Sequence, residues 1–483
     1  MSYCQSYFAA FIGATTLRSR MICTTFLLLT LITIVCFVQS AVAEVRPNAL
    51  FSDNAVLQRD RKIPVWGTAA EGEEVKVTLG DKSASTTAKD GKWQVELEPM
   101  KAGGPYTLTI EGKNKVEAKN ILIGEVWICS GQSNMQWAVN QTADPKQTIA
   151  AANYPRIRLV TIPRGGKSKP QDDVAAKWEE CSPETVPPFS AVAYHFGVAL
   201  YKQLDVPIGL ISTNVGGTPA QHWTSKEGLA SQPELAGFAA EKNASELYNA
   251  MIHPLVPYAI RGAIWYQGES NAGQAHRYRT LFPTMIQDWR NVWKQGDFPF
   301  LFVQLAPHRK KVDKPGDSTW AELREAQLMT LSKLPNTGMA VIMDVGDEED
   351  IHPKAKQPVG QRLALAARAL AYGEKVEHTG PMYESLSVEN GRAVLRFRNI
   401  GQGLEVRGDK LTGFSIAGED KVFHNAEAKI EGDTVVVSSP EVKTPVAVRF
   451  GWADFPQVNL WNKNGLPASP FRTDNFDGIT KGK

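Results

Sequence analysis

The sequence predicts an α/β protein in which a doubly wound parallel sheet is flanked by β-sandwich regions at both ends. Three observations predict this class. Apolar and polar residues alternate between residues 44 and 119, short apolar runs alternate with helical patterns between residues 120 and 373, and alternation returns after residue 374. A period of two is typical of half-buried strands, and strands that alternate with helices are typical of a parallel sheet with helices on both faces.

The first 43 residues are predicted to be a signal peptide. Arg18 and Arg20 precede an apolar run at residues 21–38, and Ala41-Val42-Ala43 is a small-x-small cleavage site. We therefore expect cleavage near Ala43 and export to the periplasm or the extracellular space. No later stretch is long and apolar enough to span a bilayer, so no membrane association is expected after cleavage.

The charge distribution bears on nucleic-acid binding, and the cysteine content bears on disulfide formation. The 53 basic and 51 acidic residues are well mixed and form no basic stripe, so no nucleic-acid partner is expected. Three of the five cysteines lie in the predicted signal peptide, which leaves Cys129 and Cys181. An oxidising compartment would permit a bridge between them, but a buried free thiol fits the sequence equally well.

We predict that residues 44–119 form the first β-sandwich, residues 120–373 the α/β domain and residues 374–483 a second β-rich region. In the α/β domain, the expected strands are 121–128, 206–212, 259–266, 298–305 and 339–345, and the expected helices are 191–204, 278–293, 320–334 and 357–371. Ligands bind beyond the carboxyl ends of the strands in such sheets. Residues that directly follow these strands are therefore candidates for a functional site.

Gly131-Gln132-Ser133-Asn134-Met135 directly follows the first of these strands. A glycine-flanked turn at this point would raise the Ser133 hydroxyl to the rim of the sheet. A serine becomes a useful nucleophile only with a general base and an oxyanion site. Met135 stands where the nucleophile elbow of α/β-hydrolases has a glycine, so that fold is not expected.

Later segments offer both a base and oxyanion donors. Of the eight histidines, only His352 combines the end of a predicted strand, an adjacent acidic run and a following helix. Gly216-Gly217 follows the second strand, where a glycine N–H can approach a substrate oxygen closely. Asn271 follows the third strand, and its amide can serve as a further donor.

Together, these segments resemble the sialate O-acetylesterase family of the SGNH (GDSL-like) hydrolase superfamily. The matching pieces are VWICSGQSNMQW, NVGGTPAQHW, AIWYQGESNA, DVGDEEDIHP and GLPASPFRTDNF. The resemblance implies an SGNH-type, flavodoxin-like sheet and the hydrolysis of acetyl esters on a sugar or polysaccharide, with no cofactor. No metal site is predicted, because the acidic run of Asp344, Asp347, Glu348, Glu349 and Asp350 is expected to be a solvated loop, with Ca²⁺ binding as the alternative. It also implies Ser133 as the nucleophile, His352 as the base, and an oxyanion hole formed by the N–H groups of Ser133 and Gly217 and by Asn271.

The sequence departs from the superfamily pattern at the third member of the triad. The last block is usually Asp-x-x-His, but here Glu349 is the third residue before His352 and Asp350 is the second. We expect Asp350 to orient the imidazole. Glu349, Asp347 or a backbone carbonyl are the alternatives, and the last of these would leave a Ser-His dyad.

Gln132, Trp223 and Gln267 are predicted to bind the substrate, Trp223 by stacking on a sugar unless it is a core tryptophan. Sialic acid and acetylxylan-like polysaccharides are alternative substrates. A non-catalytic carbohydrate-binding protein is the alternative from another functional class. The sequence does not predict the oligomeric state.

Overall fold

The computed structural model describes residues 44–483, and Val45–Lys483 form one compact unit. The predicted signal peptide at residues 1–43 lies outside the described residues. Among the helices of residues 44–483, none is long and apolar enough to cross a membrane.

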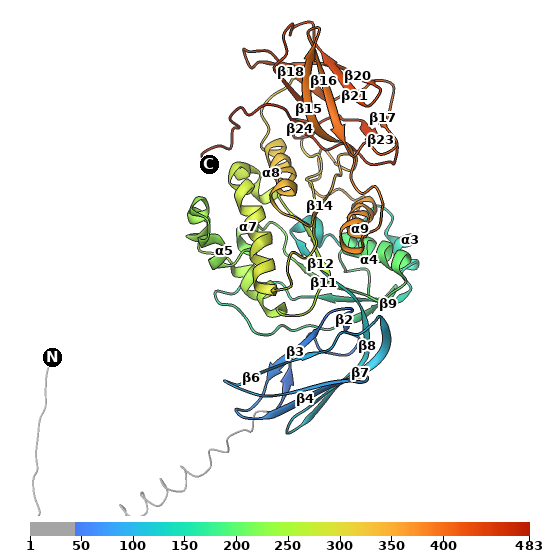
Figure 1. Ribbon diagram of the computed structural model, residues 1–483, viewed down its shortest axis with the longest axis vertical. Coiled ribbons are helices and arrows are strands. Elements are labelled where there is room, and N and C mark those ends of the chain that lie inside the picture. The colour runs from blue at the N-terminus through green and yellow to red at the C-terminus, as the bar shows by residue number, and fades with distance from the viewer. Residues whose placement is uncertain (1–43) are drawn as a thin grey trace, which may run out of the picture. The chain divides into compact units, whose positions relative to one another are not determined.

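A large mixed sheet with helices around it forms the centre of this unit (Figure 1). Within the described residues the sheet has 11 strands, and β9, β11, β8, β12, β13 and β14 lie side by side and run parallel. The sheet is not parallel throughout, because β10 pairs antiparallel with β9 and β7 pairs antiparallel with β8. The bounds are β7 Gly103–Glu111, β8 Lys115–Gly131, β9 Tyr154–Thr161, β10 Glu179–Cys181, β11 Ile208–Asn214, β12 Gly262–Tyr266, β13 Phe300–Val303 and β14 Thr337–Ala340.

Helices cover both faces of the parallel strands. Helix α4 packs against α9 and α7 against α8, and Figure 1 shows these pairs on opposite sides of the strands. Numbered along the chain, the six parallel strands β9-β11-β8-β12-β13-β14 lie in the order 2-3-1-4-5-6. The bounds are α2 Ser133–Gln136, α3 Pro145–Ala150, α4 Ala191–Leu204, α5 Lys226–Ala230, α6 Ala236–Ala239, α7 Ala275–Trp293, α8 Thr319–Lys333 and α9 Gln357–Tyr372.

Strand β8 joins the N-terminal strands to the central sheet. Its first half pairs antiparallel with β7, and its second half pairs parallel with β11 and β12. The predicted boundary at residues 119/120 falls inside this strand, near the point where the pattern changes from alternately exposed and buried residues to continuously buried ones. As a result, some N-terminal strands extend the large sheet (β2 Val56–Gln58, β4 Glu74–Leu79, β5 Lys82–Thr87), and the others form a separate sheet (β1 Arg46–Pro47, β3 Ile63–Thr68, β6 Lys92–Leu97).

The periodicity of the sequence did not predict strand β9. Its apolar run is interrupted by Arg158, which is buried in the strand. The guanidinium of Arg158 donates hydrogen bonds to Asn54 Oδ1 (3.1 Å) and to the carbonyl oxygen of Pro155 (2.8 Å), so its burial is compensated by polar contacts.

Two hydrophobic cores form within the described residues. The first contains residues from Val45 to Met382 and the second contains residues from Ala393 to Phe471. Antiparallel sheets surround the second core. Their strands are β15 Met382–Glu389, β16 Arg392–Arg398, β17 Leu404–Val406, β18 Phe414–Ala417, β19 Phe423–Asn425, β20 Glu427–Glu431, β21 Thr434–Ser438, β22 Ala447–Phe450, β23 Leu460–Asn462 and β24 Phe471–Arg472.

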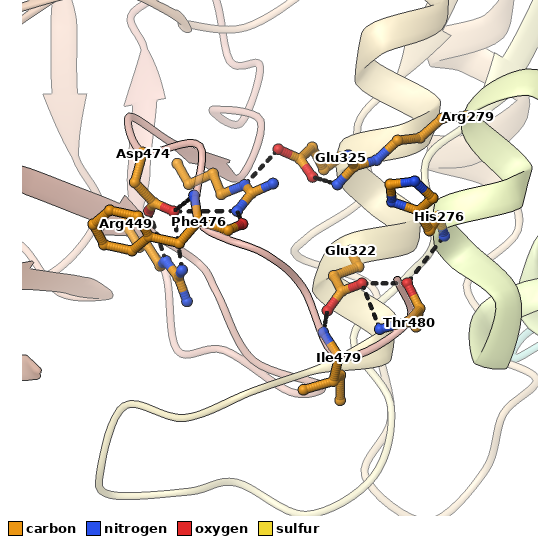
Figure 2. Close-up of polar contacts among 10 residues, drawn as sticks. His276, Arg279, Glu322, Glu325, Arg449, Asp474, Phe476, Ile479 and Thr480 are labelled. Carbon is orange, nitrogen blue, oxygen red and sulfur yellow. Dashed lines mark hydrogen bonds and ion pairs between the residues drawn. The ribbon is translucent and has the colours of Figure 1, made fainter. Parts of the chain in front are cut away.

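After β24 the chain returns to helices α7 and α8 (Figure 2). The carboxylate of Glu322 on α8 accepts hydrogen bonds from the backbone N–H groups of Ile479 (2.7 Å) and Thr480 (3.2 Å) and from the Thr480 hydroxyl. Thr480 Oγ1 in turn accepts a hydrogen bond from the backbone N–H of His276 (3.0 Å), near the start of α7. The C-terminal segment is therefore held against the helix that follows the loop of Asn271.

Candidate active site

The chain turns sharply after the central strand β8. Gly131 has φ +143°, and a Cβ at this position would lie 2.2 Å from the Tyr266 carbonyl oxygen on β12, so only glycine fits. Ser133 begins the short helix α2 and is half-buried. Among the described residues its Oγ has no hydrogen-bond partner. The turn therefore leaves this hydroxyl free at the carboxyl end of the central strand.

Gly216 and Gly217 follow β11 on the neighbouring side of this turn. A Cβ on Gly216 would lie 3.3 Å from Ser133 Cβ, and the Gly216 N–H donates a hydrogen bond to Gln136 Oε1 (2.7 Å). Gly217 is exposed with φ +72°, and a Cβ there would have open space. Its N–H makes no hydrogen bond within the described residues. Glycine thus serves close approach at position 216 and backbone conformation at position 217.

Asn271 lies in the 3-10 helix η6 (Glu269–Gln274) and is buried. Its Oδ1 accepts hydrogen bonds from the Ala220 N–H (2.9 Å) and from Gln267 Nε2 (2.7 Å). Its Nδ2 donates one hydrogen bond to Gln221 Oε1 (3.0 Å), which leaves its second hydrogen without a partner among the described residues. These contacts fix the orientation of the amide.

Gln267 and Gln132 hold loops together. Gln267 is completely buried, and besides Asn271 it bonds to the Thr218 carbonyl (3.3 Å) and the Tyr278 hydroxyl (2.9 Å). The structure therefore does not support a direct contact between Gln267 and a substrate. Gln132 Oε1 accepts hydrogen bonds from the backbone N–H groups of Gly268 (3.4 Å) and Ser270 (3.2 Å), which ties the Ser133 turn to the Asn271 loop.

Trp223 lies in the core and not at the rim. It ends the 3-10 helix η2 (Ala220–Trp223), its exposure is 0%, and its Nε1 donates to Thr218 Oγ1 (3.0 Å). The ring meets the buried Trp265 edge to face at 5.9 Å. The prediction that Trp223 stacks on a sugar is therefore contradicted, because the helical turn directs the indole under the loop.

His352 lies in the loop between β14 and α9, and its side chain is 26% exposed. Its ring stacks on Trp137, with centroids 4.9 Å apart and planes inclined by 15°. Asp350 Oδ1 is 3.3 Å from His352 Nδ1 and also accepts a hydrogen bond from the His352 backbone N–H (2.8 Å). Burial lowers the pKa of His352, the charge of Asp350 opposes this shift, and the charge of Lys356 adds to it.

The other carboxylates of the acidic run are directed elsewhere. Asp347 Oδ1 accepts hydrogen bonds from the backbone N–H groups of Glu349 (2.9 Å) and Asp350 (3.0 Å), which lower the pKa of Asp347 and shape the loop. Glu349 is exposed, and its carboxylate makes no hydrogen bond to the rest of residues 44–483. Of the three candidates, Asp350 is thus the one in contact with His352.

The structure also reveals a buried polar cluster that the sequence did not single out. Asn134 Nδ2 donates to Glu269 Oε1 (2.6 Å) and to the Ile351 carbonyl oxygen (3.0 Å), and Asn134 Oδ1 accepts a hydrogen bond from Lys356 Nζ. Burial lowers the pKa of Lys356 to about 7 and raises the pKa of Glu269. Lys356 falls in a polar stretch typical of a surface loop, so no sequence signal indicates its burial.

Ser133 and His352 are linked through their neighbours. No hydrogen bond joins their side chains among the described residues. The contact between Asn134 and the Ile351 carbonyl oxygen links the residue after Ser133 to the residue before His352. Trp137 adds a second link, because its backbone N–H donates to the Ser133 carbonyl (2.9 Å) while its ring stacks on His352.

Cys129 and Cys181 are both buried free thiols, so the bridge that the sequence left open is not formed in this structure. Within residues 44–483, no group of three or more His, Cys, Asp or Glu side chains is arranged to hold a metal ion.

Comparisons with known proteins identify similar carbohydrate acetylesterases. Residues 123–369 match the family model described as "Carbohydrate esterase, sialic acid-specific acetylesterase". Sialate O-acetylesterases from Pongo abelii and Homo sapiens are each 32% identical, with alignments that cover 87% of this chain and 91% of the relative. A crystal structure of a novel carbohydrate acetylesterase from Xanthomonas citri is 42% identical and superposes with a TM-score of 0.84, covering 89% of this chain and 100% of that one.

Proposed function

Because the chain belongs to the carbohydrate esterase family of sialic acid-specific acetylesterases, we propose that it removes acetyl groups from sugar hydroxyls by means of a serine nucleophile. Family membership implies a carboxylic ester hydrolase. The finer proposal concerns the residues that perform the reaction. One observation carries this proposal. His352 contacts Asp350 and stacks on Trp137, and Trp137 lies one helical turn after Ser133, whose hydroxyl is free.

The strand order supports an SGNH-type assignment of the fold. The four proposed groups, Ser133, Gly217, Asn271 and His352, follow β8, β11, β12 and β14 in turn. Ligands bind at this edge in doubly wound sheets.

In the proposed mechanism, His352 Nε2 takes the proton from Ser133 Oγ as this oxygen attacks the acetyl carbonyl carbon. The bond between the carbonyl carbon and the sugar oxygen then breaks, and the sugar hydroxyl leaves with the proton from His352. Water, deprotonated by the same imidazole, attacks the acetyl-serine ester. Acetate leaves and Ser133 recovers its proton.

The environment of His352 suits both roles of the imidazole in this scheme. Burial lowers the pKa of His352, which keeps the ring neutral and able to accept a proton near neutral pH. When the ring becomes positively charged, the carboxylate of Asp350 at 3.3 Å stabilises the imidazolium.

Three donors are proposed to stabilise the oxyanion. They are the backbone N–H groups of Ser133 and Gly217 and the second Nδ2 hydrogen of Asn271. The hydrogen bonds of Asn271 to Ala220, Gln221 and Gln267 support this role, because a donor that is already oriented needs no reorganisation when charge develops.

An O-acetylated sialic acid is the proposed substrate, and an acetylated polysaccharide such as acetylxylan is the second candidate. The relatives named sialate O-acetylesterase favour the first. The Xanthomonas citri structure, at 42% identity, is described more broadly as a carbohydrate acetylesterase, a description that covers both candidates. Acetate release from both classes of substrate at equal ester concentration distinguishes them.

We also propose that the protein is exported after removal of residues 1–43. N-terminal sequencing of the mature protein should then begin at Glu44. A mature protein that retains Met1 or Met21 would contradict export by this route.

The catalytic proposal is tested with Ser133→Ala on p-nitrophenyl acetate and on O-acetylated sugars. We expect hydrolysis to be abolished and the melting temperature to be unchanged, because a half-buried hydroxyl without a hydrogen bond contributes little to packing. His352→Ala should lower the rate of hydrolysis about as much, since removing one member of a catalytic unit costs nearly as much rate as removing all of them. The alternative of a non-catalytic sugar-binding protein predicts no hydrolysis by the wild type, and full activity of Ser133→Ala would refute the nucleophile.

A further inference from the structure

Three segments of the candidate site meet at the side chain of Asn134. Through Nδ2 it bonds to Glu269, which begins the loop of Asn271, and to the carbonyl of Ile351, which precedes His352. Through Oδ1 it accepts a hydrogen bond from Lys356 at the start of α9. Both amide hydrogens and the amide oxygen are therefore used inside the protein.

Lys356 occupies a site that is unfavourable for a cation. The residue is 1% exposed, and its ammonium lies over the rings of Tyr266 (5.3 Å) and Trp137 (5.8 Å). It also stands at the N-terminus of α9, where the helix dipole disfavours positive charge. The loss of hydration at the Lys356 amine is compensated by the Asn134 oxygen, the two aromatic faces and the buried carboxylate of Glu269.

The hydrogen bonds to Lys356 and Glu269 determine which way the Asn134 amide faces. Its oxygen accepts from the Lys356 amine and its nitrogen donates to the Glu269 carboxyl oxygen, and a flipped amide would place two oxygens against each other and two nitrogens against each other. Aspartate has the same size as asparagine but cannot donate to Glu269 or to the Ile351 carbonyl. The geometry therefore requires an amide at this position.

We propose that Asn134 is a positioning residue that sets Ser133 against His352 and the Asn271 loop, and that Lys356 and Glu269 hold it in place. This proposal rests on the proposed function, because it assigns a purpose to the geometry of that same site. Asn134 does not touch the substrate in this scheme. It acts through the segments on either side of it.

The test compares Asn134→Asp, Asn134→Ala and Lys356→Met with the wild type on p-nitrophenyl acetate, whose small leaving group removes any contribution from sugar contacts. Both Asn134 variants should lower kcat on the order of 10²-fold, the loss that follows from misplacing reacting groups by about 1 Å, with little change in KM. Asn462→Ala is the matched control. Asn462 is also buried and fully hydrogen-bonded, but it lies in the C-terminal β-region, so this variant should lose stability and keep kcat.

Lys356→Met supplies a second measurement, the position of the acidic limb of the kcat/KM pH profile, which a general loss of structure would not change. The charges of Asp350, Lys356 and His308 act on the pKa of His352, and those of Glu269 and Asp350 act on the pKa of Lys356. Removing the Lys356 charge should raise the pKa of His352 and shift the acidic limb of the kcat/KM profile to higher pH. A structural defect alone would lower the rate at every pH without this shift.

The outcomes separate the two proposals. If the wild type is inactive, or if Ser133→Ala keeps its activity, the proposed function fails. If both of these behave as expected while folded Asn134→Asp and Asn134→Ala keep the wild-type kcat, the positioning role is wrong. Should the Asn134 variants fail to fold, Lys356→Met decides, and an unchanged kcat with an unmoved acidic limb would overturn the role.

Discussion

Asp350 is the acidic side chain best placed to orient His352, although it is not deeply buried. Its side chain is 40% exposed and its Oδ1 lies 3.3 Å from Nδ1, so water can partly replace it. Asp347 instead binds two backbone N–H groups of the same loop, and Glu349 is exposed. These differences predict three distinct results for the three carboxylates.

Asp350→Asn should lower kcat by on the order of 10², which is less than the ~10⁴ lost with a buried triad aspartate. The charge of Asp350 raises the pKa of His352, so its removal should move the acidic limb of kcat/KM to lower pH, opposite to the shift expected for Lys356→Met. Glu349→Gln should match the wild type, and Asp347→Asn should act mainly through loop order. Full pH profiles of the three variants check this, and equal kcat values in all three would leave a Ser-His dyad.

At the scale of elements, the loop that carries Asn271 is braced against the loop after β11. Ala220, Gln221 and Gln267 all bond to the Asn271 amide, so its removal leaves buried polar groups unpaired. The same bonds orient the proposed oxyanion donor. One side chain thus contributes to both stability and catalysis.

Asn271→Ala should lower kcat by roughly 100- to 1000-fold, the usual cost of one oxyanion donor, and should also reduce stability. Asn271→Asp separates the effect on kcat from the effect on stability. It keeps an oxygen that accepts from the Ala220 N–H but loses the Nδ2 hydrogens that would bind the oxyanion. Steady-state kinetics combined with urea unfolding measure both effects. A change confined to KM would show that Asn271 only binds the sugar.

The two tryptophans near the site should respond differently to substitution. Trp223 is fully buried against Trp265, whereas Trp137 is half-buried and stacks on His352. Trp223→Ala should cost about 3–5 kcal/mol of unfolding free energy, as for other buried aromatic truncations. Trp137→Ala should chiefly lower kcat. Denaturant unfolding and kinetics of both variants provide the check, and a folded Trp223→Ala with only a raised KM would restore the sugar-stacking interpretation.

At the scale of the whole unit, the chain ends against the helices beside the site. The carboxylate of Glu322 receives three hydrogen bonds from Ile479 and Thr480, and Thr480 also accepts from the N–H of His276 near the start of α7 (Figure 2). The last residues therefore help to order the helix that follows the Asn271 loop.

Glu322→Ala should release this segment and lower the free energy of unfolding by roughly 1.5–3 kcal/mol, the net contribution of hydrogen bonds to a charged group. Lys481→Ala is the control in the same segment, since the Lys481 side chain makes an exposed ion pair with Asp477 whose loss should leave stability unchanged. Thermal unfolding and limited proteolysis of the C-terminus measure the effect. Equal stability of both variants would contradict a structural role for the segment.

The sequence by itself determined the alternation of strands and helices and the positions after β8, β11 and β12 at which Ser133, Gly217 and Asn271 occur. Both follow from local rules, because hydrophobic period reflects burial and strand ends carry turn residues. The pattern could not indicate that β8 crosses from one region into the next, or that Arg158 lies inside a strand, since both depend on partners far away in the chain.

Only the tertiary structure decided which polar side chains are buried and which contacts compensate the loss of their hydration. Lys356 stands in an ordinary polar stretch, Trp137 ends the serine motif without a sign that it contacts a histidine, and Trp223 resembles a rim residue until its neighbours are known. Hydrogen bonds such as those of Asn134 join residues up to 222 positions apart. The free energy of a buried charge depends on these distant contacts, so no local pattern in the chain can predict them.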